Sequence, residues 1–273
     1  MWYRMLLLCS LLLAMPLLIM RAGYFLATST QQNVSRQAVS TCTVQRRFTV
    51  YDNTHYSGID LEQYGLIKSN ILEEDTASKQ AIVAGKTPDK TLFKQRIAQN
   101  DKNSGPLVID FEDLYLTGTS TTAQHHFQIL VQLAQWAHEA ASGKIIGFYG
   151  LLNNTNAKYI SLARQLVRYE DAFFPSLYTF SSDRTQWHQH LMQDVHLAQK
   201  IAPGKPVYPY IWPQYHEHTP QALQYIDASY WLFQLDELHQ YTDGAVIWSS
   251  TKPNGNNGWV SATAQFMKSI STC

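Results

Sequence analysis

The chain has 273 residues, of which 45% are hydrophobic, 12% aromatic and 15% charged, and this length fits one large domain or two small ones. Lysine and arginine together number 21, as do aspartate and glutamate, so no overall charge attracts nucleic acid, which we exclude as a partner. The low charge and high aromatic content favour an extracellular protein that handles sugars.

The first 22 residues have the pattern of a signal peptide or signal anchor. Arg4 precedes an uncharged apolar run, residues 5–20, and Arg21 follows it. The run is shorter than the roughly 20 apolar residues of a free-standing membrane span, which favours a signal peptide. The small-x-small pattern before Ala22 and Ala27 is poor, so an uncleaved anchor stays open. Both interpretations place the rest of the chain outside the cytoplasm, either secreted or anchored by residues 5–20.

Residues 23–46 are rich in Ser, Thr and Gln and predict a linker, which leaves one domain over residues 47–273. Two of the three cysteines, Cys42 and Cys273, belong to the exported part, whereas Cys9 lies in the apolar run. In an oxidising compartment, a pair of cysteines at opposite ends of a domain predicts a disulfide.

Short apolar runs alternate with longer segments of helical period along this domain. Seven runs predict buried strands, at residues 48–53, 80–85, 107–112, 144–149, 172–178, 206–210 and 245–249. Apolar residues at helical spacing predict helices across 127–137 and 187–198. This alternation predicts an α/β fold with a parallel sheet, either a barrel or an open doubly wound sheet. No strand is followed by a glycine-rich phosphate loop, which argues against the common nucleotide-binding proteins.

The third apolar run ends in two carboxylates. Asp110 and Glu112 are two residues apart, so on a strand their side chains point to the same side. In a barrel both would project into the C-terminal mouth, where such folds carry their active sites. Two close, partly buried carboxylates cannot both ionise freely, and a retained proton is what a glycosidase acid needs. The alternative is that these acids only cap the following segment.

Four other predicted strands end in aromatic residues: Tyr149, Tyr178, Tyr210 and Trp248. Each one alone is compatible with a place in the core. At the mouth of a barrel, however, the four would form a ring on which sugars stack, and the phenol hydroxyls would bind sugar substituents.

Taken together, these segments resemble the hyaluronidase family of glycoside hydrolases from about residue 47 to 250. The resemblance is carried by Phe48-Thr49-Val50-Tyr51, Val108-Ile109-Asp110-Phe111-Glu112, Gly147-Phe148-Tyr149, Phe174-Pro175-Ser176-Leu177-Tyr178, Val207-Tyr208-Pro209-Tyr210-Ile211-Trp212 and Asp243-Gly244-Ala245-Val246-Ile247-Trp248-Ser249. It implies a TIM-like (β/α) barrel, a seven-stranded closed parallel sheet with outer helices. It also implies retaining endo-hydrolysis of β-linked N-acetylhexosamine polysaccharides such as hyaluronan, chondroitin or a related polymer.

The resemblance also implies roles for individual residues. Glu112 is the proton donor, and the substrate's acetamido oxygen is the nucleophile, which Asp110 and a tyrosine orient. Further site residues carried over are the catalytic Tyr178 and Tyr210 and the substrate contacts Trp248, Tyr149, Tyr51 and Trp212. No cofactor is implied. The ten histidines form no metal-ligand pattern, so no metal is expected. The expected partner is a polysaccharide, bound by a monomer.

The chain departs from the family at several points. Leu114, Tyr115 and Leu116 stand where the family carries an aromatic residue, an arginine and a proline, so a positive group is lost and an anionic substrate is in doubt. A long insertion and the family's disulfide positions are also missing, which predicts a more open cleft. The loop His216-Glu217-His218 is a possible subsite contact. A catalytically inactive carbohydrate-binding barrel is the second hypothesis, and the presence of Glu112 favours the enzyme.

Overall fold

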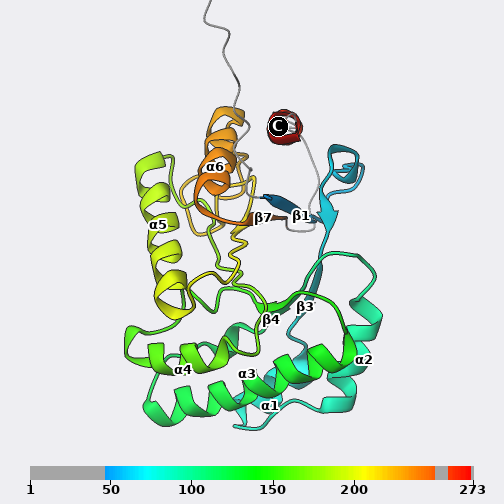
Figure 1. Cartoon of the computed structure of the whole chain (residues 1–273), viewed down its shortest axis with the longest axis vertical. Helices are drawn as coiled ribbons and strands as arrows, with labels where there is room; N and C mark the ends of the chain where they lie inside the picture. The colour runs from blue at the N-terminus through cyan, green and yellow to red at the C-terminus, as the bar shows by residue number, and fades with distance from the viewer. Residues whose placement is uncertain (1–46, 250–257, 272–273) are drawn as a thin grey trace, which may run out of the picture. The chain divides into compact units, whose positions relative to one another are not determined.

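A computed structural model of the chain describes residues 47–249 and 258–271 (Figure 1). The predicted signal segment, the linker and both cysteines of the predicted Cys42–Cys273 pair lie outside the described residues. The disulfide, the domain boundary and the localisation therefore stay predictions. No helix in the described ranges is long and apolar enough to cross a membrane.

Strands and helices alternate along the described chain. Their order is β1 (Thr49–Asn53), β2 (Ile67–Lys68), β3 (Asn70–Glu73), α1 (Thr76–Val83), α2 (Lys90–Asn100), β4 (Leu107–Asp110), α3 (Ser120–Ala140), β5 (Ile146–Phe148), α4 (Ile160–Leu166), α5 (Arg184–Ile201), β6 (Tyr210–Ile211), α6 (Ala228–Tyr241), β7 (Gly244–Trp248) and α7 (Gly258–Ser271). Short 3-10 turns are η1 (Glu62–Tyr64), η2 (Glu112–Leu114) and η3 (Ala157–Tyr159). All ladders between these strands are parallel, as the alternation predicts.

The strand pairings follow one another round a TIM-like barrel. Regular ladders form two sheets, in the orders β2-β1-β7-β6 and β3-β4-β5. β2 and β3 are consecutive in the chain, with only Ser69 between them, and so join the sheets on one side. On the other side, Phe174 forms a parallel bridge with Tyr149 after β5, and Ser176 forms one with Tyr210 in β6. The barrel therefore consists of two sheets, joined by the chain on one side and by single bridges on the other, where the resemblance implies one closed sheet.

Proline interrupts the ladders between β5 and β6. Residues 172–178 are a predicted strand but form only isolated bridges, because Pro175 has no N–H to donate. Pro206 and Pro209 have the same effect on the facing segment, where β6 is reduced to two residues.

One predicted strand is wrong. Residues 80–85 lie at the end of helix α1 and in the turn after it. Asp75 caps this helix, because its carboxylate accepts a hydrogen bond from the Ser78 backbone N–H at 2.6 Å. The second strand of the barrel is instead the short pair β2 and β3, which the sequence pattern missed. The two helices predicted across 127–137 and 187–198 are confirmed as parts of α3 and α5.

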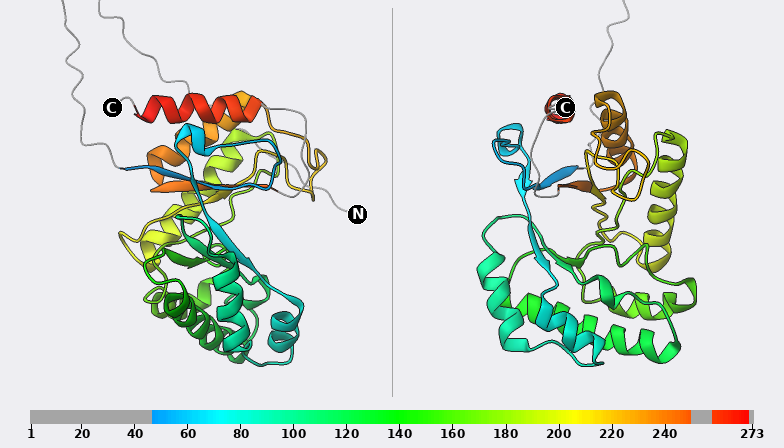
Figure 2. Two further views of the ribbon diagram at one scale, coloured as in Figure 1. Left: turned by 90° about the vertical axis from the view of Figure 1, so that its right-hand side faces the viewer. Right: turned by 180° about the vertical axis from the view of Figure 1, so that it is seen from behind.

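Alternate side chains of the strands face the barrel lumen and the outer helices. On β4, Val108 lies in the lumen core, whereas Leu107 and Ile109 pack in a separate core with α2, α3 and α4. On β7, Val246 faces the lumen, and Ile247 packs in a third core with α5, α6 and α7. Figure 1 shows α1 to α4 on the side of β3 and β4, and α6 next to β7 with α5 at its outer side; Figure 2 gives two further views.

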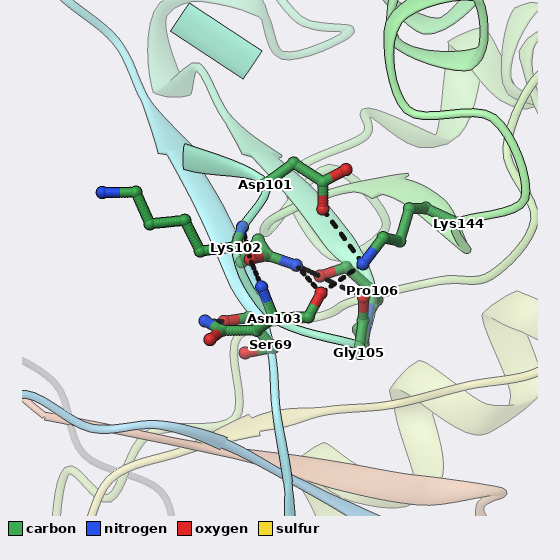
Figure 3. A network of polar contacts seen from close by, with 8 residues as sticks. Ser69, Asp101, Lys102, Asn103, Gly105, Pro106 and Lys144 are labelled. Carbon is green, nitrogen blue, oxygen red and sulfur yellow. Dashed lines mark hydrogen bonds and ion pairs between the residues drawn. The ribbon is translucent and has the colours of Figure 1, made fainter. Parts of the chain in front are cut away.

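A polar network binds the loop before β4 to β3 (Figure 3). The Asn70 side chain is only 2% exposed. Its oxygen accepts hydrogen bonds from the backbone N–H groups of Lys102 and Asn103, at 3.1 and 2.9 Å. Its amide nitrogen lies 3.1 Å from the Asn103 carbonyl oxygen and 3.3 Å from that of Gly105. Both ends of this buried amide are therefore satisfied.

The same network reaches the start of β5. The Lys144 ammonium contacts the Asp101 carboxylate at 3.0 Å and donates to the carbonyl oxygen of Asn103 (Figure 3). Gly105 allows the chains to approach closely, because a Cβ there would lie 2.5 Å from the Lys68 carbonyl oxygen. The N-terminal ends of β3, β4 and β5 are thus held by paired polar groups.

Candidate active site

Asp110 is the last residue of β4 and points to the lumen side of the barrel. It continues the alternation of Val108, which faces the lumen, because the two residues are two positions apart. Glu112 begins the 3-10 turn η2 after the strand, and its side chain is exposed. The predicted strand over 107–112 is therefore two residues shorter, but both carboxylates line the same pocket.

This pocket has a volume of about 290 Å³ and lies where several strand ends meet. It brings together six of the eight residues predicted for the site: Asp110, Glu112, Tyr149, Tyr178, Tyr210 and Trp248. Its remaining lining residues are Ile71, Glu73, His216, Glu217 and His218. The convergence of residues nearly 140 positions apart is what parallel strands opening on one face of a barrel require.

Tyr51 and Trp212, the other two predicted site residues, are buried among other aromatic side chains of the lumen core. Tyr51 is buried in the lumen and packs edge-on against Tyr208, with ring centroids 5.3 Å apart. Trp212 is buried against Trp248, at 4.9 Å between centroids, and its indole N–H donates to Gln214 at 3.1 Å. Neither residue is among those that line the pocket, so the structure gives both a supporting position.

Aromatic rings form one wall of the pocket and hold one another in place. Tyr178 stacks on Trp248 with centroids 5.6 Å apart and an interplanar angle of 30°. Tyr149 lies edge-on to Tyr210 at 5.0 Å, and its hydroxyl donates to the Ser176 hydroxyl oxygen at 3.0 Å. Such a wall offers flat apolar faces together with phenol hydroxyls, which suits a sugar ring.

The electrostatics of the pocket centre on Asp110. Burial, and then the charges of Glu112, Glu73 and Glu74, raise the pKa of Asp110 from 3.8 to about 7. Glu73 is close because it is the register partner of Asp110 across the β3–β4 ladder. Asp110 therefore holds a proton up to near-neutral pH. The sequence predicts a retained proton in this pair, and the structure shows why Asp110 can carry it.

Two buried polar atoms in the pocket have no hydrogen-bond partner in the described part of the protein. They are Oδ1 of Asp110 and the hydroxyl oxygen of Tyr210. Burial raises the pKa of Tyr210 well above its ordinary value, so its hydroxyl stays protonated. Unpaired buried polar atoms are costly, and their presence in a pocket indicates that a ligand can satisfy them.

Sequence reasoning missed Ile71 and Glu73 because it missed β3. The signal was present in the run Asn70-Ile71-Leu72-Glu73, in which apolar residues end in an acid as they do in β4. His216, a possible contact in the sequence, does line the pocket and stacks on Phe180 at 4.5 Å. Burial and the neighbouring His218 lower the pKa of His216, which favours its neutral form.

A larger pocket, of about 510 Å³, lies beside α1 and α3. Its lining includes a single carboxylate, Asp113, which is bound by Lys79 at 3.0 Å, and no tyrosine or tryptophan. Volume alone therefore does not select the site. Among the residues that the structure describes, no group of three or more histidine, cysteine, aspartate or glutamate side chains could hold a metal ion.

No protein-family model and no curated protein matches the chain. Among solved structures, bee venom hyaluronidase matches with a TM-score of 0.59 and 15% sequence identity, over 83% of this chain and 98% of that chain. Bee venom hyaluronidase in complex with a hyaluronic acid tetramer matches with a TM-score of 0.59 and 14% identity, over 82% of this chain and 96% of that chain. At such identity the likeness concerns the fold: this chain folds as an α/β TIM-like barrel similar to that of bee venom hyaluronidase.

Proposed function

We propose that the protein is a retaining endo-glycoside hydrolase that cleaves β-linked N-acetylhexosamine polysaccharides by substrate-assisted acid catalysis. One observation carries this proposal: Asp110 and Glu112 share a pocket with a wall of tyrosines and a tryptophan at the C-terminal mouth of the barrel. Glycoside hydrolases use a pair of carboxyl groups for catalysis, and aromatic rings beside such a pair can stack on the sugar.

Glu112 is the proposed proton donor because its carboxyl group is exposed at the rim of the pocket. There the glycosidic oxygen of a bound polymer can reach it. As its proton passes to that oxygen, the bond from the oxygen to C1 breaks. The carbonyl oxygen of the acetamido group bonds to C1 from the opposite face and forms a cyclic oxazolinium ion. A water molecule then attacks C1 with overall retention, the bond between C1 and the acetamido oxygen breaks, and the proton of the water passes to Glu112.

Asp110 is suited to support the acetamido group rather than to attack C1. A carboxyl whose pKa is about 7 is protonated in mildly acidic solution and is then a poor nucleophile. Its unpaired Oδ1 can accept the acetamido N–H. The positive charge that develops on the oxazolinium ion favours ionisation of Asp110, and the carboxylate then stabilises that charge. The free hydroxyl of Tyr210 can donate to the acetamido oxygen and orient it.

The test measures reducing ends released from N-acetylglucosamine oligosaccharides by the purified chain. Glu112→Gln keeps the shape of the side chain but removes the proton, so we expect the rate to fall by roughly 10²- to 10⁴-fold. Glu139→Gln is the matched control and should keep the parental rate, since Glu139 lies on the outer helix α3 and pairs with Lys90 and Lys94.

A thiazoline that mimics the cyclised intermediate should inhibit the parental protein competitively. Substrates without an acetamido group should be inert. Rapid cleavage of such substrates, or a Glu112→Gln variant with the parental rate, would contradict the mechanism. Binding of oligosaccharides without any cleavage would favour the second hypothesis, a carbohydrate-binding barrel that lacks turnover.

A further inference from the structure

The candidate active pocket contains four carboxyl groups and no lysine or arginine among its lining residues. Asp110 and Glu112 come from the end of β4 and the turn after it, Glu73 from the end of β3, and Glu217 from the loop after β6. Two histidines also line the pocket: the lowered pKa of His216 favours its uncharged form, and His218 lies 3.7 Å from the Glu217 carboxylate, which it balances only when protonated. The pocket wall therefore carries four carboxyl groups and no lysine or arginine beside them.

Two cations near the pocket, Lys79 and Arg96, are bound by acids that do not line it. Lys79 contacts the carboxylate of Asp113 at 3.0 Å and that of Glu74 at 3.9 Å. Arg96 contacts the carboxylate of Asp75 at 2.6 Å. These pairs follow directly after β3 and β4, so the acids of the pocket continue into a rim where each cation already has a partner.

The position at which the resemblance places an arginine holds a neutral residue in this chain. Tyr115 stands where the hyaluronidase family carries an arginine, and its ring is half-buried against the core of α3 and α4. Burial raises its pKa, so it stays a neutral phenol. A uronate carboxylate next to the cleaved bond would meet Glu73 and Glu217 without a lysine or arginine in the lining to compensate its charge.

We infer that the substrate is an N-acetylhexosamine polymer without uronic acids, uncharged or partly deacetylated, and that Glu73 and Glu217 exclude anionic polymers. The inference rests on the proposed function. In hyaluronan or chondroitin a uronate adjoins every hexosamine, so every productive alignment places a carboxylate beside this acidic wall. Like charges brought together in a partly desolvated site repel each other and select against the wrong partner. Free ammonium groups on neighbouring sugars are attracted instead.

The test compares three oligosaccharides of equal length: a fully acetylated β-linked N-acetylglucosamine oligomer, its partly deacetylated form and a hyaluronan oligomer. At low ionic strength we expect kcat/KM for hyaluronan to be at least about tenfold below that for the uncharged oligomer. The partly deacetylated oligomer should equal or exceed the uncharged one. Added salt should narrow all of these differences, because it screens exposed charges.

The double variant Glu73→Gln, Glu217→Gln neutralises two lining carboxyls and leaves Asp110 and Glu112 in place. We expect it to raise the ratio of hyaluronan to uncharged-oligomer kcat/KM by about tenfold. Glu139→Gln, which changes an outer surface acid by the same chemistry, should leave that ratio unchanged. The ratio is the readout because it cancels any general effect of the double variant on folding or turnover.

The outcomes separate this inference from the proposed function. The charge inference is overturned if hyaluronan is cleaved as fast as the uncharged oligomer and if neither salt nor the double variant changes the ratio of their kcat/KM values. The proposed hydrolase function would remain supported by that result. Failure to cleave any of the three oligomers overturns the hydrolase. Calorimetric binding of the same three oligomers then tests charge selection directly, and equal affinities would overturn it.

Discussion

The two ends of strands β3 and β4 differ in whether their buried polar side chains have hydrogen-bond partners. At the N-terminal end, the buried Asn70 side chain has partners for both its oxygen and its nitrogen. Three residues further along the same ladder, Glu73 and Asp110 are register partners. There, two carboxyl side chains lie side by side, and Oδ1 of Asp110 is buried without a partner among the described residues.

Polar groups that stabilise the fold and polar groups suited to bind a ligand therefore lie only a few residues apart on the β3–β4 ladder. Satisfied buried hydrogen bonds hold a fold together, whereas crowded or unpaired polar groups cost stability and persist where a ligand uses them. In parallel barrels the C-terminal ends carry the site and the N-terminal ends carry stability. Substitutions at the N-terminal end should therefore mainly lower stability, and substitutions at the C-terminal end should mainly lower activity.

Asp110→Asn should lower activity and raise stability. We expect the rate to fall by at least about 100-fold, because the neutral amide gives the oxazolinium ion less charge support. The carboxyl pKa is raised from 3.8 to about 7, so the stability associated with its protonated form is full below pH 3.8 and is lost as the pH rises to about 7. At pH 8 the variant should therefore be more stable, by at most about 4 kcal/mol.

Urea unfolding of both proteins at pH 4 and pH 8 measures this effect. The gain should be large at pH 8 and small at pH 4, where the Asp110 carboxyl of the folded parental protein is protonated and therefore uncharged, like the amide that replaces it. Asp60→Asn changes an exposed aspartate and should alter the unfolding free energy by less than about 0.5 kcal/mol at both pH values. A pH-independent gain would show that the charge of Asp110 is not the cause.

Asn70→Ala should lower stability with little effect on the activity of the folded molecule. It removes the partners of two backbone N–H groups in the loop before β4, so we expect a loss of about 2–4 kcal/mol in the free energy of unfolding. Asn100→Ala is the control, since Asn100 is exposed at the end of α2 and should cost less than about 1 kcal/mol. A specific activity at low temperature that fell as far as that of Asp110→Asn would break the contrast between the two ends.

Trp248→Ala should have the smallest effect of the three and should act on binding. The ring stacks on Tyr178 and lines the pocket, so its loss removes one flat surface for the sugar. We expect KM to rise by about tenfold with kcat largely kept, as for the loss of one aromatic contact of about 1.5 kcal/mol. Trp248→Tyr keeps a flat ring and should recover most of the affinity. A fall in kcat alone would assign Trp248 a different role.

The sequence by itself identified those parts of the fold that are long or locally periodic. The apolar residues of α3 and α5 recur at helical spacing. The apolar run of β4, which ends in an acidic residue, predicts a strand with a carboxylate at its end. The rule that residues two apart share a face then sufficed to place Asp110 on the lumen side, and the aromatic strand ends marked the other pocket residues.

Tertiary structure alone decided the rest. β2 and β3 are too short to show a period, and they are strands because neighbours supply their hydrogen bonds: Ser69 donates to the Asp52 carbonyl oxygen, and Asn70 to that of Pro106. The apolar run at 80–85 belongs to a helix because Asp75 caps its start. The raised pKa of Asp110 is likewise a sum over burial and acids from β3 and β4, which no local pattern contains, because burial and charge depend on what folding brings together.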